Sequence, residues 1–158
     1  MAWSSCAGAN GGWYASLTRC VHFGRPPEAL RRKMEAVATI VTVFISSTCP
    51  GRTLGSVFAD AQVACAQAGF PDDWKMHRQG GSSRYEPREL VAVSGMVKDI
   101  VAGQAFAWNP SIQGAKSEET IPVGPDNNEI LTSIVGWPTI PIVVNGREYL
   151  RPGIHEVM

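Results

Sequence analysis

The chain has no excess of either charge and no long apolar run. Lys and Arg together number 14, and Asp and Glu also number 14, so the formal net charge is zero. Proteins bind nucleic acid and anionic membrane surfaces through an excess of positive charge, so the sequence predicts neither partner. The longest apolar stretch, residues 37–45, contains Thr39 and Thr42 and is too short to span a bilayer. A net charge near zero also favours self-association.

The cysteines lack the spacing of a metal finger or a redox motif. There are four of them and no CxxC pair. We interpret them as reduced, small apolar residues, although an even count leaves disulfides as an alternative. The N-terminus has no basic region followed by an apolar core, so no secretory signal is predicted. These absences predict a cytoplasmic protein.

The hydrophobic pattern predicts a single α+β domain over residues 1–158. Residues 11–23 are rich in aromatic and β-branched residues and favour a strand. Two helices follow, over residues 28–46 and from Thr53 to Gly69, with apolar residues at helical spacing. Thr53 is a suitable N-cap and Gly69 a suitable C-terminal stop. Further strand-like segments are predicted at 102–109, 117–123, 129–135 and 140–151, with turn signals such as Asn145-Gly146.

Four segments, in this order, resemble motifs of the pita-bread metallopeptidase superfamily. That superfamily includes methionine aminopeptidase, aminopeptidase P, prolidase and creatinase. Residues 12–19 resemble its Gly-Tyr-x-x-Asp-(Leu/Ile)-Thr-Arg strand, and residues 49–54 its Lys-Pro-Gly-x-Thr helix start. Residues 104–110 resemble a strand ending in Phe-x-x-Glu-Pro, and residues 116–123 resemble Arg-x-Glu-Asp-Thr-x-x-Val.

The resemblance implies a curved antiparallel sheet with helices on one side. The family's domain begins well before its first aspartate strand, whereas Met1 lies only four residues before the matching position, Ser5. We therefore expect an incomplete pita-bread domain that lacks the N-terminal half. An exposed strand edge would need a cover, so we expect a homo-oligomer or a partner chain that completes the fold.

The metal ligands of the family do not carry over. Its two metal ions are held by two aspartates, one histidine and two glutamates. A residue-by-residue match places these five ligands, in chain order, on Ser5, Ser16, Gly81, Asn109 and Glu118. Only Glu118, which matches the second glutamate, has the residue type of the family's ligand. Divalent ions need oxygen-rich, charged ligand sets, so the resemblance implies no metal and no other cofactor. A shifted loop alignment would make His77 a ligand, still short of the usual three.

Three functions remain open. The first is a non-metallo pseudo-peptidase that binds a peptide or small molecule, with Arg88, Asn109 and Lys116 as substrate-binding residues. The second is a metal-independent amidino- or amidohydrolase similar to creatinase, with His77 as general acid/base and Glu118 as the carboxylate that grips the substrate. The third is a divergent Xaa-Pro metallopeptidase. An active enzyme would thus be a hydrolase, but His77 is also consistent with a purely structural histidine.

Overall fold

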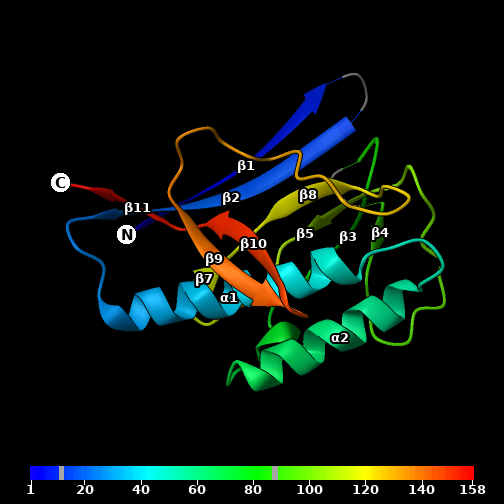
Figure 1. Ribbon diagram of the computed structural model, residues 1–158, viewed down its shortest axis with the longest axis horizontal. Coiled ribbons are helices and arrows are strands. Elements are labelled where there is room, and N and C mark those ends of the chain that lie inside the picture. The colour runs from blue at the N-terminus through cyan, green and yellow to red at the C-terminus, as the bar shows by residue number, and fades with distance from the viewer. Residues whose placement is uncertain (11–12, 87–88) are drawn as a thin grey trace.

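Two helices lie on one side of a layer of β-strands (Figure 1). The structure is a computed structural model and describes residues 1–10, 13–86 and 89–158. Helices α1 (Glu28–Ser47) and α2 (Leu54–Gln67) come between the second and third strands, followed by the short 3-10 helix η1 (Asp73–Lys75). The order of strand, two helices and a run of strands confirms the α+β prediction.

The strands form two main sheets and two small hairpins. The sheet orders are β1-β2-β11 and β4-β3-β5-β8, with β9 pairing with β10 and β6 with β7. All pairs are antiparallel except the one between β2 and β11. The bounds are β1 Ala2–Asn10, β2 Trp13–Phe23, β3 Gly80–Ser83, β4 Leu90–Val91, β5 Ala105–Trp108, β6 Ser111–Ile112, β7 Ala115–Lys116, β8 Glu119–Pro122, β9 Thr139–Val144, β10 Arg147–Pro152 and β11 Ile154–Val157.

The two main sheets meet where β2 runs beside the start of β8. The backbone N–H of Thr18 donates to the carbonyl oxygen of Glu118 at 3.2 Å, and the two residues form an antiparallel bridge. The Thr120 hydroxyl donates to the Ser16 carbonyl at 2.9 Å and accepts from the Ser16 N–H at 2.8 Å. These bonds join the sheets into one layer.

The helices form where the pattern predicts them. In α1, apolar residues at helical spacing are buried: Met34, Val37, Val41 and Phe44. In α2, the Thr53 hydroxyl accepts from the Ser56 N–H at 3.2 Å and so caps the first turn. Gly69 follows the helix with a φ of +87°, which a residue with a side chain rarely adopts.

An aromatic stack ties the helices to the sheet. Trp108 on β5 stacks on Phe44 of α1 with ring centroids 4.4 Å apart, and its indole N–H donates to the Thr48 hydroxyl at 3.0 Å. Because Trp108 is fully buried and its polar atom is satisfied, it belongs to the core.

One strand prediction is wrong. Residues 129–135 form turns and irregular segments, not a strand. The Leu131 N–H donates to the Thr120 carbonyl at 3.0 Å and the Thr132 hydroxyl accepts from the Thr120 N–H at 3.2 Å, so isolated contacts replace a ladder. The predicted turn at Asn145-Gly146 is confirmed: it divides residues 140–151 into the two strands of the β9–β10 hairpin, and both of its residues have positive φ.

Among the described residues, neither helix combines the length and apolar character needed to cross a lipid bilayer.

The cysteines provide a direct test of the packing. All four are free thiols, with Cys6 and Cys49 exposed and Cys20 and Cys65 buried. Burial raises the pKa of the Cys65 thiol to about 11, with a smaller contribution from Asp73, and burial also raises the pKa of Cys20. Because the thiolate is the reactive form, Ellman's reagent at pH 8 should label two thiols rapidly and all four only after unfolding. Equal rates for all four thiols would contradict this packing.

Candidate functional site

A chain of hydrogen bonds links β1, β2 and the residues that lead into β8. Ser5 and Thr18 are paired in register, and their hydroxyl oxygens lie 2.8 Å apart. The Thr18 hydroxyl donates to Oε2 of Glu118 at 2.7 Å. Since that bond uses the only hydroxyl hydrogen of Thr18, Ser5 must be the donor to Thr18. We call Ser5, Thr18, Lys116 and Glu118 the Glu118 network.

Lys116 supplies a positive charge to this network. Its ammonium group donates to the same Oε2 of Glu118 at 3.1 Å. The Glu118 side chain is only 7% exposed and that of Lys116 is 25% exposed, so the pair is partly screened from water. Removing one partner of such a pair leaves an uncompensated, partly buried charge. The network is therefore an organised ion pair rather than a loose surface contact.

Ser16 and Asn109 lie beside the network. Ser16 is buried and bonded through its backbone to Thr120. Asn109 directly follows β5, and its N–H donates to the Gln79 carbonyl at 2.9 Å. Trp108 pairs with Glu119, so one further step of the same register places Asn109 across from Glu118. Among the described residues, the buried side-chain oxygen of Asn109 has no hydrogen-bond partner.

Gly81 lies in β3, between β4 and β5. It pairs with Val91 on one side and Ala107 on the other. A Cβ atom added to Gly81 would lie 1.8 Å from the carbonyl oxygen of Leu90, far inside van der Waals contact. With β4 in this position, no side chain fits here, and least of all the imidazole of a histidine.

Within the part of the chain that the structure describes, His77 makes no contact with the Glu118 network. Its side chain is exposed and the residue precedes β3. Its backbone carbonyl accepts from the Gln79 side-chain amide at 2.6 Å, whereas its ring makes no hydrogen bond or ion pair within the described ranges. Arg88 lies outside the described residues.

Neighbouring glutamates face opposite sides of the sheet, as the alternation of a strand predicts. Glu118 points to the network, whereas Glu119 forms a buried ion pair with Arg19, with Nη1 and Oε1 3.1 Å apart. The Thr132 hydroxyl also donates to Glu119. The sequence reasoning missed this second cluster, because its members come from distant segments and share no local spacing.

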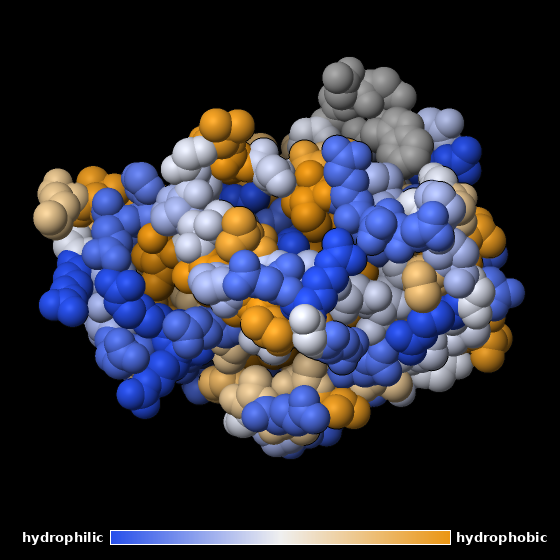
Figure 2. All heavy atoms as spheres, viewed as in Figure 1, coloured by the Kyte–Doolittle hydropathy of each residue, from blue (hydrophilic) through white to orange (hydrophobic). Residues whose placement is uncertain are grey.

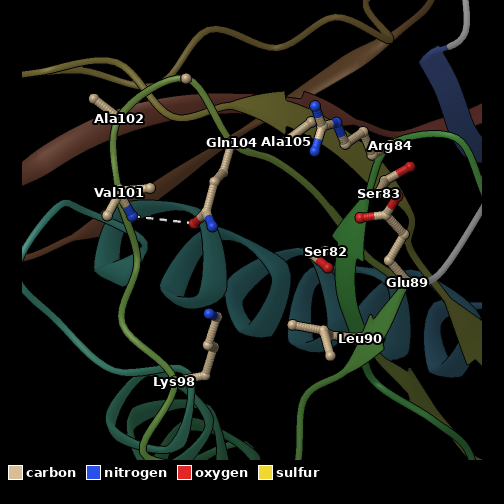
Figure 3. A pocket seen from close by; sticks show the side chains of 11 residues that line it. Ser82, Ser83, Arg84, Glu89, Leu90, Lys98, Val101, Ala102, Gln104 and Ala105 are labelled. Atoms are coloured by element: carbon tan, nitrogen blue, oxygen red, sulfur yellow. Dashed lines mark hydrogen bonds between the residues drawn. The ribbon is translucent and has the colours of Figure 1, made fainter.

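A cavity of about 530 Å³ lies elsewhere (Figure 3). It is bounded by β3, β4 and the loop that leads into β5, and Figure 3 shows Lys98, Gln104, Ser82 and Leu90 pointing into it. Gln104 is held there because its side-chain oxygen accepts from the Val101 N–H at 3.0 Å. None of the predicted site residues in the described chain lines this cavity, so size alone does not locate the site.

The donor set offers little to a metal ion. Across residues 1–10, 13–86 and 89–158, no group of three His, Cys, Asp or Glu side chains is arranged to hold one. At the positions that match the family's ligands, the side chains are two hydroxyls, a hydrogen atom, an amide and one carboxylate. The carboxylate already bonds Thr18 and Lys116. These residues do not fit a pair of divalent cations.

Comparison with known proteins finds similarity to a metallopeptidase family. Residues 3–128 match the sequence profile of metallopeptidase family M24. An uncharacterized peptidase from Staphylococcus epidermidis is 29% identical over 127 residues, which cover 75% of this chain and 35% of that protein.

Solved structures show the same fold. A dipeptidase, PepE, from Mycobacterium ulcerans superposes with a TM-score of 0.78 at 22% identity, covering 98% of this chain and 40% of that one. An X-Pro aminopeptidase from Thermotoga maritima gives 0.76 at 18% identity, covering 97% and 40%. The chain thus spans about two fifths or less of the length of these proteins. The pita-bread fold prediction is confirmed.

Substitution of Gly81 tests the close approach of β4. Gly81→Ala should lower the free energy of unfolding by about 1–3 kcal/mol, since the new methyl group overlaps the Leu90 carbonyl. Gly8→Ala in β1 is the matched control, because a Cβ there meets nothing within 4 Å, and should change stability by less than about 0.5 kcal/mol. Urea denaturation measures both. Equal stability of the two variants would contradict the described position of β4.

Proposed function

The chain belongs to metallopeptidase family M24, and we propose that it is a member that has lost most of its metal ligands and binds a peptide or small molecule without hydrolysing it. The observation that carries this proposal is which groups contact the Glu118 carboxylate. A lysine ammonium and a threonine hydroxyl contact this carboxylate, which is the one that matches a ligand position of the family and keeps the ligand's residue type. A peptidase that relies on metal-activated water needs a charged, oxygen-rich cage.

Two further features support the loss of the metals. Gly81 matches the histidine ligand, and the Leu90 carbonyl occupies the space that any side chain there would need. Asn109 matches a glutamate ligand, and a neutral amide contributes no charge. Restoring one ligand would therefore not restore the site, because the backbone beside Gly81 would also have to move.

Asn109 indicates the kind of group that a ligand presents. Its side-chain oxygen is buried and, among the described residues, unpartnered, and a buried acceptor without a donor costs about 1–3 kcal/mol. A ligand N–H that fills this position recovers that free energy. Together with the carboxylate of Glu118 nearby, this favours the amino or amide end of a peptide.

The creatinase-like alternative has weaker support. It requires His77 and Glu118 to act on one substrate, but the His77 side chain is exposed and its ring has no described partner to orient it. A general acid/base is normally held within hydrogen-bond reach of its target. We therefore favour binding without turnover.

An Xaa-Pro dipeptide, which resembles the substrates named for several structural relatives, is a suitable probe. Ala-Pro should raise the Tm of the full chain in a saturable manner, because a ligand at 100 times its Kd stabilises by about 2.7 kcal/mol. N-acetyl-Ala-Pro, whose amino group is blocked, should bind more weakly. Neither compound should be hydrolysed, with or without added Mn²⁺.

Variants make the binding test specific. Asn109→Leu should abolish the Tm shift, whereas Ser82→Ala, a second buried polar residue without a described partner, should retain it. Manganese-dependent release of proline would overturn the pseudo-peptidase proposal, and an equal shift in both variants would overturn the role of Asn109.

We also infer that the chain acts in the cytoplasm, a prediction supported by its four free thiols and testable by cell fractionation.

A homo-oligomer or a partner chain is also part of the proposal. Apolar residues lie among polar ones on the face shown in Figure 2, and five of the exposed apolar side chains come from the segment that includes the β9–β10 hairpin: Leu131, Ile134, Val135, Val143 and Leu150. Contacts between chains commonly cover such residues. Sedimentation velocity at micromolar concentration should give a mass above 17 kDa. A well-folded monomer would contradict self-association.

A further inference from the structure

A buried cluster of three charged residues lies on the other face of β2 and β8 from Glu118. Arg19, Glu119 and Arg151 are 4%, 1% and 5% exposed. They come from β2, β8 and β10, and Arg19 forms the ion pair with Glu119. Two guanidinium groups face one carboxylate, so the cluster holds at least one positive charge in excess. Burying an unpaired charge is costly.

Arg19 is well satisfied by the protein. Besides Glu119, its Nη1 donates to the Thr18 carbonyl at 2.9 Å and its Nη2 donates to the Thr132 carbonyl at 2.5 Å. Only its Nε remains without a partner among the described residues. Glu119 is likewise engaged, since it takes part in the ion pair and accepts the Thr132 hydroxyl. The carboxylate is therefore committed to Arg19.

Arg151 is the charged residue of the cluster whose guanidinium has no hydrogen-bond acceptor among the described residues. Its Nε is buried without a partner, and within the described residues its guanidinium makes no hydrogen bond. The guanidinium lies 5.7 Å from the ring of Tyr149 and close enough to Glu119 for the two charges to attract each other. A guanidinium carries five N–H donors, so Arg151, whose buried Nε lacks a partner, has donors that the described residues leave unused.

A small cavity borders all three charged residues. It has a volume of about 80 Å³ and is also lined by Trp137, Ser133 and apolar residues of the hairpin and the preceding loop. A site of this size holds a few groups as large as a water molecule. It is too small for a peptide and has the size of a halide ion or a short carboxylate.

We propose that this cavity binds a small monovalent anion, a halide or a short carboxylate such as formate or acetate, with Arg151 as its principal ligand. The anion neutralises the excess charge and accepts hydrogen bonds from the unused N–H donors of Arg151. A monovalent ion matches the single uncompensated charge.

The electrostatics favour an anion for either state of Glu119. Burial raises the pKa of the Glu119 carboxyl, while Arg19, Thr132 and Arg151 oppose that rise. Burial lowers the pKa of the Arg151 guanidinium, which Glu119 opposes. If Glu119 is ionised the cluster carries one excess positive charge, and if it is protonated the excess is two.

Thermal unfolding at constant ionic strength tests the site. The full chain is dialysed into a sodium MOPS buffer, in which the bulky sulfonate is the only anion, and MOPS is then replaced stepwise by chloride, bromide, formate or acetate. The wild-type Tm should rise and saturate with the preferred ion. The relative affinities show whether the cavity takes a halide or a carboxylate.

Variants that change the charge of the cluster should change its affinity for anions in opposite directions. Glu119→Gln adds net positive charge and should tighten anion binding about tenfold or more. Arg151→Met should abolish the saturable rise, whereas Arg147→Met, an exposed arginine on the same strand, should retain it. An equal, non-saturating rise in all variants would show a general salt effect and overturn the proposal.

A second measurement does not depend on the stability of the variants. The ³⁵Cl NMR line of chloride should broaden in the presence of wild-type protein beyond the effect of Arg151→Met or, if that variant does not fold, beyond the broadening that remains after acetate or formate is added in excess. Broadening that no competing anion reduces would overturn the site.

Discussion

The contact between Thr18 and Glu118 is the point on which the rest of the structure depends. Their backbone bridge joins the β1-β2-β11 sheet to the β4-β3-β5-β8 sheet, and their side chains are bonded at 2.7 Å. Because the bridge sets the register between β2 and β8, it also places the Glu118 side chain on one face of the sheet and the Glu119 side chain on the other. One junction therefore positions both the candidate binding site and the buried charge cluster.

Buried charge is compensated differently on the two faces of the sheet. On one face, Glu118 is a partly buried carboxylate that receives an ammonium group and a hydroxyl from the protein itself. On the other, Glu119 is paired with Arg19, and Arg151 is left as an extra cation. A buried charge must be paired or neutralised. The protein's own groups compensate the carboxylate on the first face, whereas the second face holds an excess charge that the proposed anion would neutralise.

Local signals were enough to predict part of this structure. The helical spacing in α1, the Thr53 cap and the Asn145-Gly146 turn are encoded by residues close together in sequence, and each is confirmed. The parallel pairing of β11 with β2 was beyond such reasoning, as was the arrival of Arg151 beside Glu119, because both depend on contacts across most of the chain. The apolar pattern of residues 129–135 predicted a strand that is not formed, since side-chain contacts of Thr132 hold that segment instead. The roles of Asn109, Lys116 and His77 in binding or catalysis stay predictions.

Manganese binding tests the central claim most directly. Hydrated Mn²⁺ gives a strong electron paramagnetic resonance signal that is lost when the ion is held by a protein, so a titration counts bound ions without reference to activity. Two equivalents of Mn²⁺ added to the purified chain should leave the free-ion signal equal to that of a protein-free sample. Loss of one or two equivalents of signal in the wild type, restored by Glu118→Gln, would contradict the account by showing that Glu118 still serves as a metal ligand.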